Sequence, residues 1–390
     1  MFRIAVLFFS EFICIFTIKM KNNSIFLFLF SLVIISLFSC DCGKEKNAEN
    51  SISTIHTTEV KKPKNIVFLI GDGMGLSQIS LTQFYQETPS NFERFPVVGL
   101  IKTSSATHVI TDSGAGGTAL SSGVKTVNRT VGVDTNFNPV ETVMELVIKN
   151  GLSTGLIATS SITNATPASF YAHNKSRYEN EEIATSLLKS DIDFFAGGGL
   201  KYFNNRKDKV NLLNELTDFG FQVDTLNFPT EVSDKKNAIL LAKKGMPKMI
   251  EGRGDFLSEA TTLAFNKLSQ NNKGFFLMVE GSQIDWAGHD MDIEYLISEQ
   301  LDFDKTIGVV LDFAKQNGET LVIVTADHET GAFALAMEDN DYNKIIPTFY
   351  SDDHSATMVP VFAYGPGAEL FGGVYENTEV HTNMITLLSK

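Results

Sequence analysis

The chain has 390 residues, of which 43% are hydrophobic and 20% are charged, a composition typical of a globular protein with a large core. Its formal net charge is −14 at pH 7, and no basic cluster with interleaved aromatic residues is present. Because such a surface repels polyanions, we predict no nucleic-acid partner, while the surplus carboxylates leave acids available for divalent metal ions.

The N-terminal residues have the pattern of an export signal. Two lysines precede an apolar stretch at 24–39, which ends in small residues before Cys40. We therefore predict a signal peptide at 1–39, with Met20 as an alternative start. The sequence LFSC resembles a bacterial lipobox, whose cysteine becomes lipidated. An uncleaved membrane anchor is the alternative, although the apolar run is short for a spanning helix.

A polar segment at 40–62 follows and lacks apolar periodicity, as expected of a lipidated cysteine with a flexible tether. The folded domain is predicted to span 63–390. All three cysteines lie ahead of it, so the domain has no disulfide and no thiolate metal site. We expect an exported protein of the periplasm or outer membrane, with membrane contact only through the N-terminal lipid.

The first strand of the domain is predicted at 65–70, where NIVFLI has the pattern of a strand buried on both faces. The strand runs into GDGMG, which places Asp72 at its carboxyl end. Ligands of open α/β sheets bind beyond the carboxyl ends of parallel strands, so Asp72 is a candidate site residue. A single aspartate here is also an ordinary turn residue.

The sequence TDSGAGGT at 111–118 places Ser113 between an aspartate and several glycines. A β-branched run ends at Thr111, and a helix is predicted after it, so Ser113 lies at or near a helix N-terminus. Free N–H groups and the helix dipole favour an anion at that position. Asp112 or Ser113 could simply cap the helix, although a capping residue can also be a nucleophile.

Helical patterns fill most of the chain between the predicted strands. They occur at 141–149, 182–189, 209–217, 257–270 and 295–316. This alternation predicts an α/β fold with a central, mostly parallel β-sheet flanked by helices on both faces. The sequence GLSTG at 151–155 matches G-x-S-x-G, but a helix precedes it and a strand follows. A nucleophile elbow requires the reverse order, so a metal-independent Ser-His-Asp esterase is disfavoured.

The second buried strand, predicted at 274–279, leads into Glu280 and the sequence EGSQIDWAGHD. Asp285 and His289 follow four residues apart, which on a helix puts both on one face and within reach of a single ion. Either residue alone is more often a solvated surface group. Because carboxylate and imidazole together suit zinc, the pair is a candidate metal site.

A third buried strand at 320–325 ends before Asp327 and His328, and His354 stands just before a fourth strand at 358–365. The chain has only seven histidines, so the proximity of three of them to these acids favours metal binding. Imidazole with carboxylate suits zinc, and all-oxygen sites suit magnesium. Neutral imidazole and ionised carboxylate need a pH that is not acidic, so activity should fall in acid.

A metal cluster would explain how Ser113 becomes reactive. A serine hydroxyl is a weak nucleophile without an adjacent base or metal ion. Two metal ions about 4 Å apart could hold the attacking and leaving oxygens of an in-line phosphoryl transfer. A non-catalytic lipoprotein that binds metal or phosphate is the alternative from another class, since it would keep the ligands and show no turnover.

Six segments resemble blocks of the alkaline phosphatase family in the same order. They are IGDGMG, TDSGAGGTALSSGVKT, NATPASFYAHNKSR, FFLMVEGSQID, VTADHETG and DHSATMVPVFAYGPGA. The resemblance covers nearly the whole folded part, and only about 200–262 matches loosely. It implies an alkaline-phosphatase-like fold and hydrolysis of phosphate monoesters through a phosphoserine intermediate. It also implies two zinc ions and one magnesium ion as cofactors.

The resemblance assigns roles to single residues. Ser113 would be the nucleophile, Arg177 would bind two phosphate oxygens, and Asp112 would orient Arg177. The zinc that activates water would be held by Asp285, His289 and His354. The zinc that activates the serine would be held by Asp72, Asp327 and His328. Magnesium would be held by Asp72, Thr166 and Glu280.

Two positions depart from the family pattern. Asn164, near the implied magnesium, stands where relatives carry aspartate or histidine, and Trp286 occupies a variable position. Few contacts to a leaving group are evident, so we expect broad specificity for small phosphate monoesters. A phosphodiesterase, sulfatase or phosphomutase of the same superfamily is the nearest alternative. Homodimers are common in the family, but the sequence contains no interface signal.

Overall fold

The computed structural model describes residues 61–389. The predicted signal peptide at 1–39, the predicted lipidation site at Cys40 and the tether as far as residue 60 lie outside the described residues. Within the described range, no helix combines the length and the apolar character needed to cross a lipid bilayer.

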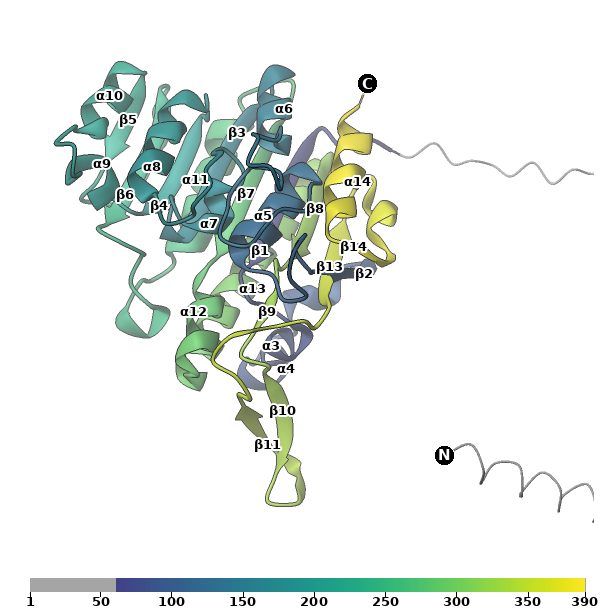
Figure 1. Cartoon of the computed structure of the whole chain (residues 1–390). Coiled ribbons are helices and arrows are strands. Elements are labelled where there is room, and N and C mark those ends of the chain that lie inside the picture. The colour runs from purple at the N-terminus through teal and green to yellow at the C-terminus, as the bar shows by residue number, and fades with distance from the viewer. Residues whose placement is uncertain (1–60, 390) are drawn as a thin grey trace, which may run out of the picture. The chain divides into compact units, whose positions relative to one another are not determined.

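A ten-stranded β-sheet runs through this part of the chain, in the order β14-β2-β13-β8-β1-β7-β3-β4-β6-β5 (Figure 1). Its strands are β1 (Asn65–Gly71), β2 (Val97–Lys102), β3 (Ser153–Ser161), β4 (Phe194–Gly198), β5 (Phe221–Asp224), β6 (Lys236–Ala242), β7 (Phe275–Gly281), β8 (Thr320–Thr325), β13 (Val359–Tyr364) and β14 (Gly373–Glu376). The strands from β8 to β5 are parallel to their neighbours, whereas β13 is antiparallel to both β8 and β2. The sheet is therefore mostly parallel.

The central strands are buried along their whole length. Every residue of β1, β7 and β8 is buried. Helices cover both faces of these strands, so their side chains are apolar in both directions and produce continuous apolar runs in the sequence. The strands predicted at 65–70, 274–279, 320–325 and 358–365 correspond to β1, β7, β8 and β13.

Two groups of helices cover the two faces of the sheet (Figure 1). On one face α5, α6 and α14 pack together, and on the other α11 packs against α13. The helices are α3 (Leu76–Ser80), α4 (Thr82–Tyr85), α5 (Ser113–Ser122), α6 (Val143–Lys149), α7 (Ala165–Ala168), α8 (Asn180–Lys189), α9 (Lys201–Asn204), α10 (Leu212–Asp218), α11 (Phe256–Leu268), α12 (Gln283–Asp290), α13 (Ile293–Asn317) and α14 (Thr378–Leu388). Short 3-10 helices occur at Asn91–Arg94, Met249–Glu251 and Ala368–Phe371. The predicted fold class is confirmed.

Capping side chains set the helix ends that periodicity alone misses. The helices predicted at 141–149, 182–189, 209–217, 257–270 and 295–316 correspond to α6, α8, α10, α11 and α13. Thr142 Oγ1 accepts from the N–H of Glu145, and the Glu145 carboxylate accepts from the N–H of Thr142. This capping box starts α6 two residues later than predicted. Asn211 caps α10 in a similar way, accepting from the N–H of Leu213.

Two small pairs of strands lie outside the main sheet. β10 (Ala334–Glu338) and β11 (Asp341–Thr348) form a hairpin that projects from the body of the fold (Figure 1). β9 (Glu329–Thr330) and β12 (His354–Ser355) form a short antiparallel bridge in which His354 lies opposite Thr330. This bridge joins the segment after β8 to the segment before β13.

Candidate active site

The carboxyl ends of three central strands bring acidic side chains together at one edge of the sheet. Asp72 follows β1, Glu280 lies near the end of β7, and Asp327 follows β8. The register of β1 with β7 pairs Ile70 with Glu280, so these strand ends are level. Because β13 is antiparallel to β8, its first residues reach this same edge, and the β9–β12 bridge brings His354 there.

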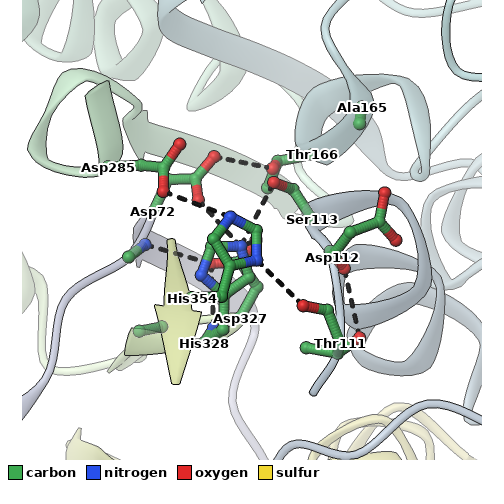
Figure 2. A network of polar contacts seen from close by, with 12 residues as sticks. Asp72, Thr111, Asp112, Ser113, Ala165, Thr166, Asp285, Asp327, His328 and His354 are labelled. Carbon is green, nitrogen blue, oxygen red and sulfur yellow. Dashed lines mark hydrogen bonds and ion pairs between the residues drawn. The ribbon is translucent and has the colours of Figure 1, made fainter. Parts of the chain in front are cut away.

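Ser113 is the first residue of α5 and faces this group of acids (Figure 2). Asp112 caps the helix, since its Oδ1 accepts a hydrogen bond from the N–H of Ala115 at 3.0 Å. Ser113 is buried, and its Oγ lies 3.2 Å from His328 Nε2. The predicted place of Ser113 at a helix N-terminus is confirmed. Its hydroxyl therefore lies both at the positive end of a helix dipole and next to an imidazole.

The same nitrogen of His328 also faces two carboxylates. Asp72 Oδ1 lies 3.4 Å from His328 Nε2, and Asp327 Oδ2 lies 3.3 Å from it. Burial lowers the pKa of His328 well below its usual value, so the imidazole is neutral and one ring nitrogen carries a lone pair. One imidazole nitrogen and two carboxylate oxygens are a donor set that suits a single zinc ion.

Asp285, His289 and His354 form a second group of donors. His289 Nε2 lies 3.5 Å and His354 Nε2 lies 3.6 Å from Asp285 Oδ1. His289 Nδ1 contacts the carbonyl oxygen of Asp352 at 2.6 Å, and His354 Nδ1 contacts that of Thr111 at 2.8 Å. A carbonyl oxygen only accepts, so in the neutral rings both Nδ1 atoms carry the proton. His289 Nε2 and His354 Nε2 then lie 3.2 Å apart with their lone pairs facing each other, an arrangement that fits a shared cation.

The two groups of donors meet at one carboxylate. Ligand atoms lie within 4.8 Å of one another in two sets: Asp285 with His289 and His354, and Asp72 with Asp285 and His328. The second set contains Asp285 where the resemblance implies Asp327. Asp285 therefore lies between the two groups, and ions bound in them would be close neighbours.

Glu280 and Thr166 extend the acidic group toward α7. Thr166 Oγ1 donates to Asp72 Oδ2 at 3.2 Å. Glu280 Oε2 accepts hydrogen bonds from the hydroxyls of Ser160 and Ser282, whereas Glu280 Oε1 has no partner in the described part of the chain. These donors are all oxygens, which are the ligands that magnesium prefers.

Three buried carboxylate oxygens of the site have no hydrogen-bond partner among residues 61–389. They are Asp72 Oδ1, Glu280 Oε1 and Asp327 Oδ2. Burial raises the pKa of Glu280 to about 7, and burial together with Asp285 raises the pKa of Asp327 to about 6. Burial and the neighbouring carboxylates raise the pKa of Asp72 as well. Unpaired buried oxygens are costly, so the donor set fits divalent cations that neutralise them.

Arg177 is held next to Ser113 through Asp112. Its Nη1 donates to Asp112 Oδ2 at 2.8 Å, and its Nη2 donates to Asn164 Oδ1 at 3.3 Å. Burial alone would raise the pKa of Asp112, but the guanidinium of Arg177 and the N–H groups of Arg129 and Ala115 together outweigh it, and the pKa is lowered. Arg177 is thus a fixed cation at the start of α5, and its planar group can bind two oxygens of a tetrahedral anion.

The structure brings all the candidate residues to this edge of the sheet, and it adds side chains that sequence reasoning missed. Ser160 and Ser282 hold the Glu280 carboxylate, and Thr330 contacts both Asp285 and His328. The sequence contains only a weak indication of these residues, since Ser282 and Thr330 each follow a candidate ligand by two positions. Hydroxyl residues are common in turns, so this spacing alone did not single them out.

The sequence is also similar to those of known proteins over most of its length. The family model described as alkaline phosphatase matches residues 63–346. Alkaline phosphatase 4 of Bacillus subtilis (strain 168) is 36% identical, over 81% of this chain and 87% of that protein. The alkaline phosphatase of Escherichia coli (strain K12) is 31% identical, over 83% of this chain and 86% of that protein.

Solved structures of alkaline phosphatases have the same fold as this chain. The alkaline phosphatase from the Antarctic bacterium TAB5 is 50% identical, with a TM-score of 0.83 over 84% of this chain and 98% of that chain. A mutant of the TAB5 enzyme with magnesium bound in a site called M3 has a TM-score of 0.82, over 84% of this chain and 99% of that chain. The similarity therefore extends over nearly the full length of these relatives.

Proposed function

This chain belongs to the alkaline phosphatase family and is a phosphomonoester hydrolase, and we propose that Ser113 is its nucleophile at a site for two zinc ions and one magnesium ion. One observation carries the proposal. Ser113 Oγ lies 3.2 Å from His328 Nε2, beside buried carboxylate oxygens that have no partner in the described structure. A hydroxyl at a helix N-terminus, next to side chains that can bind a cation, is a good candidate for ionisation at neutral pH.

The donor groups suggest how the cations are distributed. We assign one zinc to Asp285, His289 and His354. We assign the second zinc to Asp72, Asp327 and His328, and magnesium to Asp72, Thr166 and Glu280. When bound, these cations lower the pKa of a hydroxyl group and offset negative charge on the phosphoryl group. The facing imidazole lone pairs, the unpaired oxygens and the magnesium bound to the TAB5 mutant support the assignment.

Each of the site residues then has its own role in the reaction. Ser113 Oγ attacks phosphorus while the bond from phosphorus to the ester oxygen breaks and the alcohol leaves. Arg177, held by Asp112 and Asn164, donates hydrogen bonds to two phosphoryl oxygens and fixes the group in line with the attack. Water then attacks the phosphoserine, which restores Ser113 and releases inorganic phosphate.

We further propose that the protein works at the cell envelope, in the periplasm or on the outer membrane. A signal peptide at 1–39 would direct export, lipidated Cys40 would anchor the chain, and the tether at 40–62 would hold the catalytic domain at 63–390. The lysines before the apolar run and the LFSC sequence support this organisation. Small phosphate monoesters would be the substrates, and a homodimer stays a prediction.

The test is hydrolysis of p-nitrophenyl phosphate with zinc and magnesium present. Ser113→Ala should lower kcat by roughly 10³-fold or more, because it removes the nucleophile. Ser122→Ala is the matched control, since Ser122 Oγ donates to the carbonyl of Thr118 within the same helix, and it should keep the wild-type rate. An undiminished rate for Ser113→Ala would overturn the proposal. Faster hydrolysis of bis-p-nitrophenyl phosphate or p-nitrophenyl sulfate by the wild type would instead favour a phosphodiesterase or a sulfatase.

A further inference from the structure

Thr330, the second residue of β9, is buried, and its hydroxyl contacts one donor of each proposed zinc site. Its Oγ1 donates to Asp285 Oδ1 and lies 3.2 Å from His328 Nδ1. We propose that Thr330 is a positioning residue shared by the two groups, which orients Asp285 in one and His328 in the other. The inference rests on the zinc assignment of the proposed function and extends it to a residue that binds no metal itself.

The single proton of the hydroxyl decides the direction of both hydrogen bonds. The Thr330 hydroxyl donates to Asp285 Oδ1, so its proton lies toward that carboxylate oxygen. Thr330 Oγ1 then offers only lone pairs to His328, and His328 Nδ1 must be the donor. His328 Nε2 therefore keeps its lone pair on the side that faces Ser113 Oγ, 3.2 Å away. Thr330 thus selects the tautomer of His328 that can bind a cation.

Two glycines make room for Thr330 beside metal donors. A Cβ at Gly288, which precedes His289, would come within 2.9 Å of Thr330 Cγ2. A Cβ at Gly73, which follows Asp72, would come within 2.7 Å of Thr330 Oγ1, and Gly73 also has a φ of +71° that favours glycine. The N–H of Thr330 donates to the carbonyl of Gly73 at 3.0 Å. One side chain is therefore packed between the segments that carry donors of both groups.

The backbone of Thr330 is held as firmly as its side chain. Thr330 pairs with His354 across the β9–β12 bridge. Gln78 Nε2 donates to the Thr330 carbonyl at 2.9 Å and to Glu329 Oε1 at 2.9 Å. Glu329 also accepts from the hydroxyl of Ser355, the neighbour of His354. Because the N–H, the carbonyl and the hydroxyl of Thr330 are all hydrogen-bonded, Thr330 can hold the side chains of Asp285 and His328 in one orientation.

The test is zinc binding to the metal-free protein, measured by competition with a chromophoric chelator. Thr330→Val keeps the shape of the side chain and removes the hydroxyl, and we expect it to weaken the binding of both zinc ions by about 10- to 100-fold. Thr330→Ser keeps the hydroxyl and should restore affinity close to wild type. Thr261→Val is the matched control, because Thr261 is buried in α11 and its hydroxyl, within the described residues, bonds only the carbonyl of Leu257.

Wild-type affinity of Thr330→Val for both ions would overturn the inference, and so would weakening of one ion alone. A Thr330→Ser variant as weak as Thr330→Val would also contradict it, since packing rather than the hydroxyl would then be responsible. Wild-type protein that binds no zinc would instead show that the metal assignment of the proposed function is wrong. Circular dichroism of each metal-free variant checks that the fold is retained.

Discussion

Two buried clusters of acidic side chains in residues 61–389 differ in whether they contain a cation of their own. The salt-bridge cluster consists of Arg253, Glu299 and Asp302. Arg253 Nη1 donates to Glu299 Oε1 at 3.1 Å, and its Nη2 donates to Asp302 Oδ2 at 2.8 Å. Burial raises the pKa of Glu299 and of Asp302, but the guanidinium of Arg253 opposes that rise in both. This cluster carries its own counter-charge.

The site cluster consists of Asp72, Glu280 and Asp327, and it has no such partner. Where the structure describes the chain, the one basic side chain within ion-pair distance of its carboxylates is His328, whose imidazole is neutral. Neighbouring carboxylates add to the effect of burial on the pKa of Asp72, and the guanidinium of Arg177 opposes that rise less strongly than any of these causes promotes it. A buried acidic cluster with an internal cation needs no added ion, whereas we expect a cluster without one to bind an external cation.

Removal of divalent cations should have the largest effect, and only on the site cluster. We expect a chelator to lower the rate of p-nitrophenyl phosphate hydrolysis by roughly 10³-fold or more, because cations supply several kcal/mol of transition-state stabilisation. Zinc with magnesium should restore the rate. The far-UV circular dichroism spectrum should stay unchanged, since the salt-bridge cluster needs no added ion. An undiminished rate in chelator would remove the distinction between the clusters.

Substitution of single charges in each cluster should give the next largest effect. Arg253→Met leaves Glu299 and Asp302 buried without a counter-charge and should lower the free energy of unfolding by about 3–5 kcal/mol. In metal-free protein, Asp327→Asn removes one of several mutually repelling carboxylates, so it should leave the free energy of unfolding unchanged or raised. Urea denaturation measures both variants. Equal destabilisation by the two substitutions would show that the clusters are of one kind.

The pH dependence of stability should give the smallest effect. The pKa of Glu280 rises in the fold from an ordinary 4.5 to about 7, so between these values the folded metal-free chain keeps a proton that the unfolded chain has lost. The free energy of unfolding of the wild type should therefore fall relative to that of Glu280→Gln as pH rises through this interval. Denaturation of both metal-free proteins at pH 5 and pH 7.5 tests the sign. A relative gain for the wild type would contradict it.

The sequence was sufficient to predict the site cluster but not the salt-bridge cluster. Continuous apolar runs mark the central parallel strands, and the acids at their carboxyl ends must meet at one edge of the sheet. Arg253 lies outside any periodic pattern, and Glu299 and Asp302 are three residues apart on a helix, like many solvated pairs. Their contact depends on how the segment before α11 packs on α13, which no local pattern encodes.

Residues outside the long strands and helices show the same limit within the site. Thr166 and Arg177 were singled out only through the family resemblance, because one precedes a proline and the other lies in a polar segment. The β9–β12 bridge, which places His354 and Thr330, joins two short segments that have no strand signal of their own. Gln78 holds β9 through hydrogen bonds to Glu329 and to the Thr330 carbonyl, and the hydroxyl of Ser355 ties β12 to Glu329.

The central claim is that Ser113 attacks phosphorus and becomes phosphorylated in each turnover. The most direct measurement is acid quenching of the zinc- and magnesium-loaded enzyme during hydrolysis, followed by mass spectrometry of the tryptic peptide that spans 103–125. We predict one phosphoryl group on Ser113 in the wild type and none in Ser113→Ala. A phosphoryl group on another residue, or unmodified Ser113 during rapid turnover, would contradict the account.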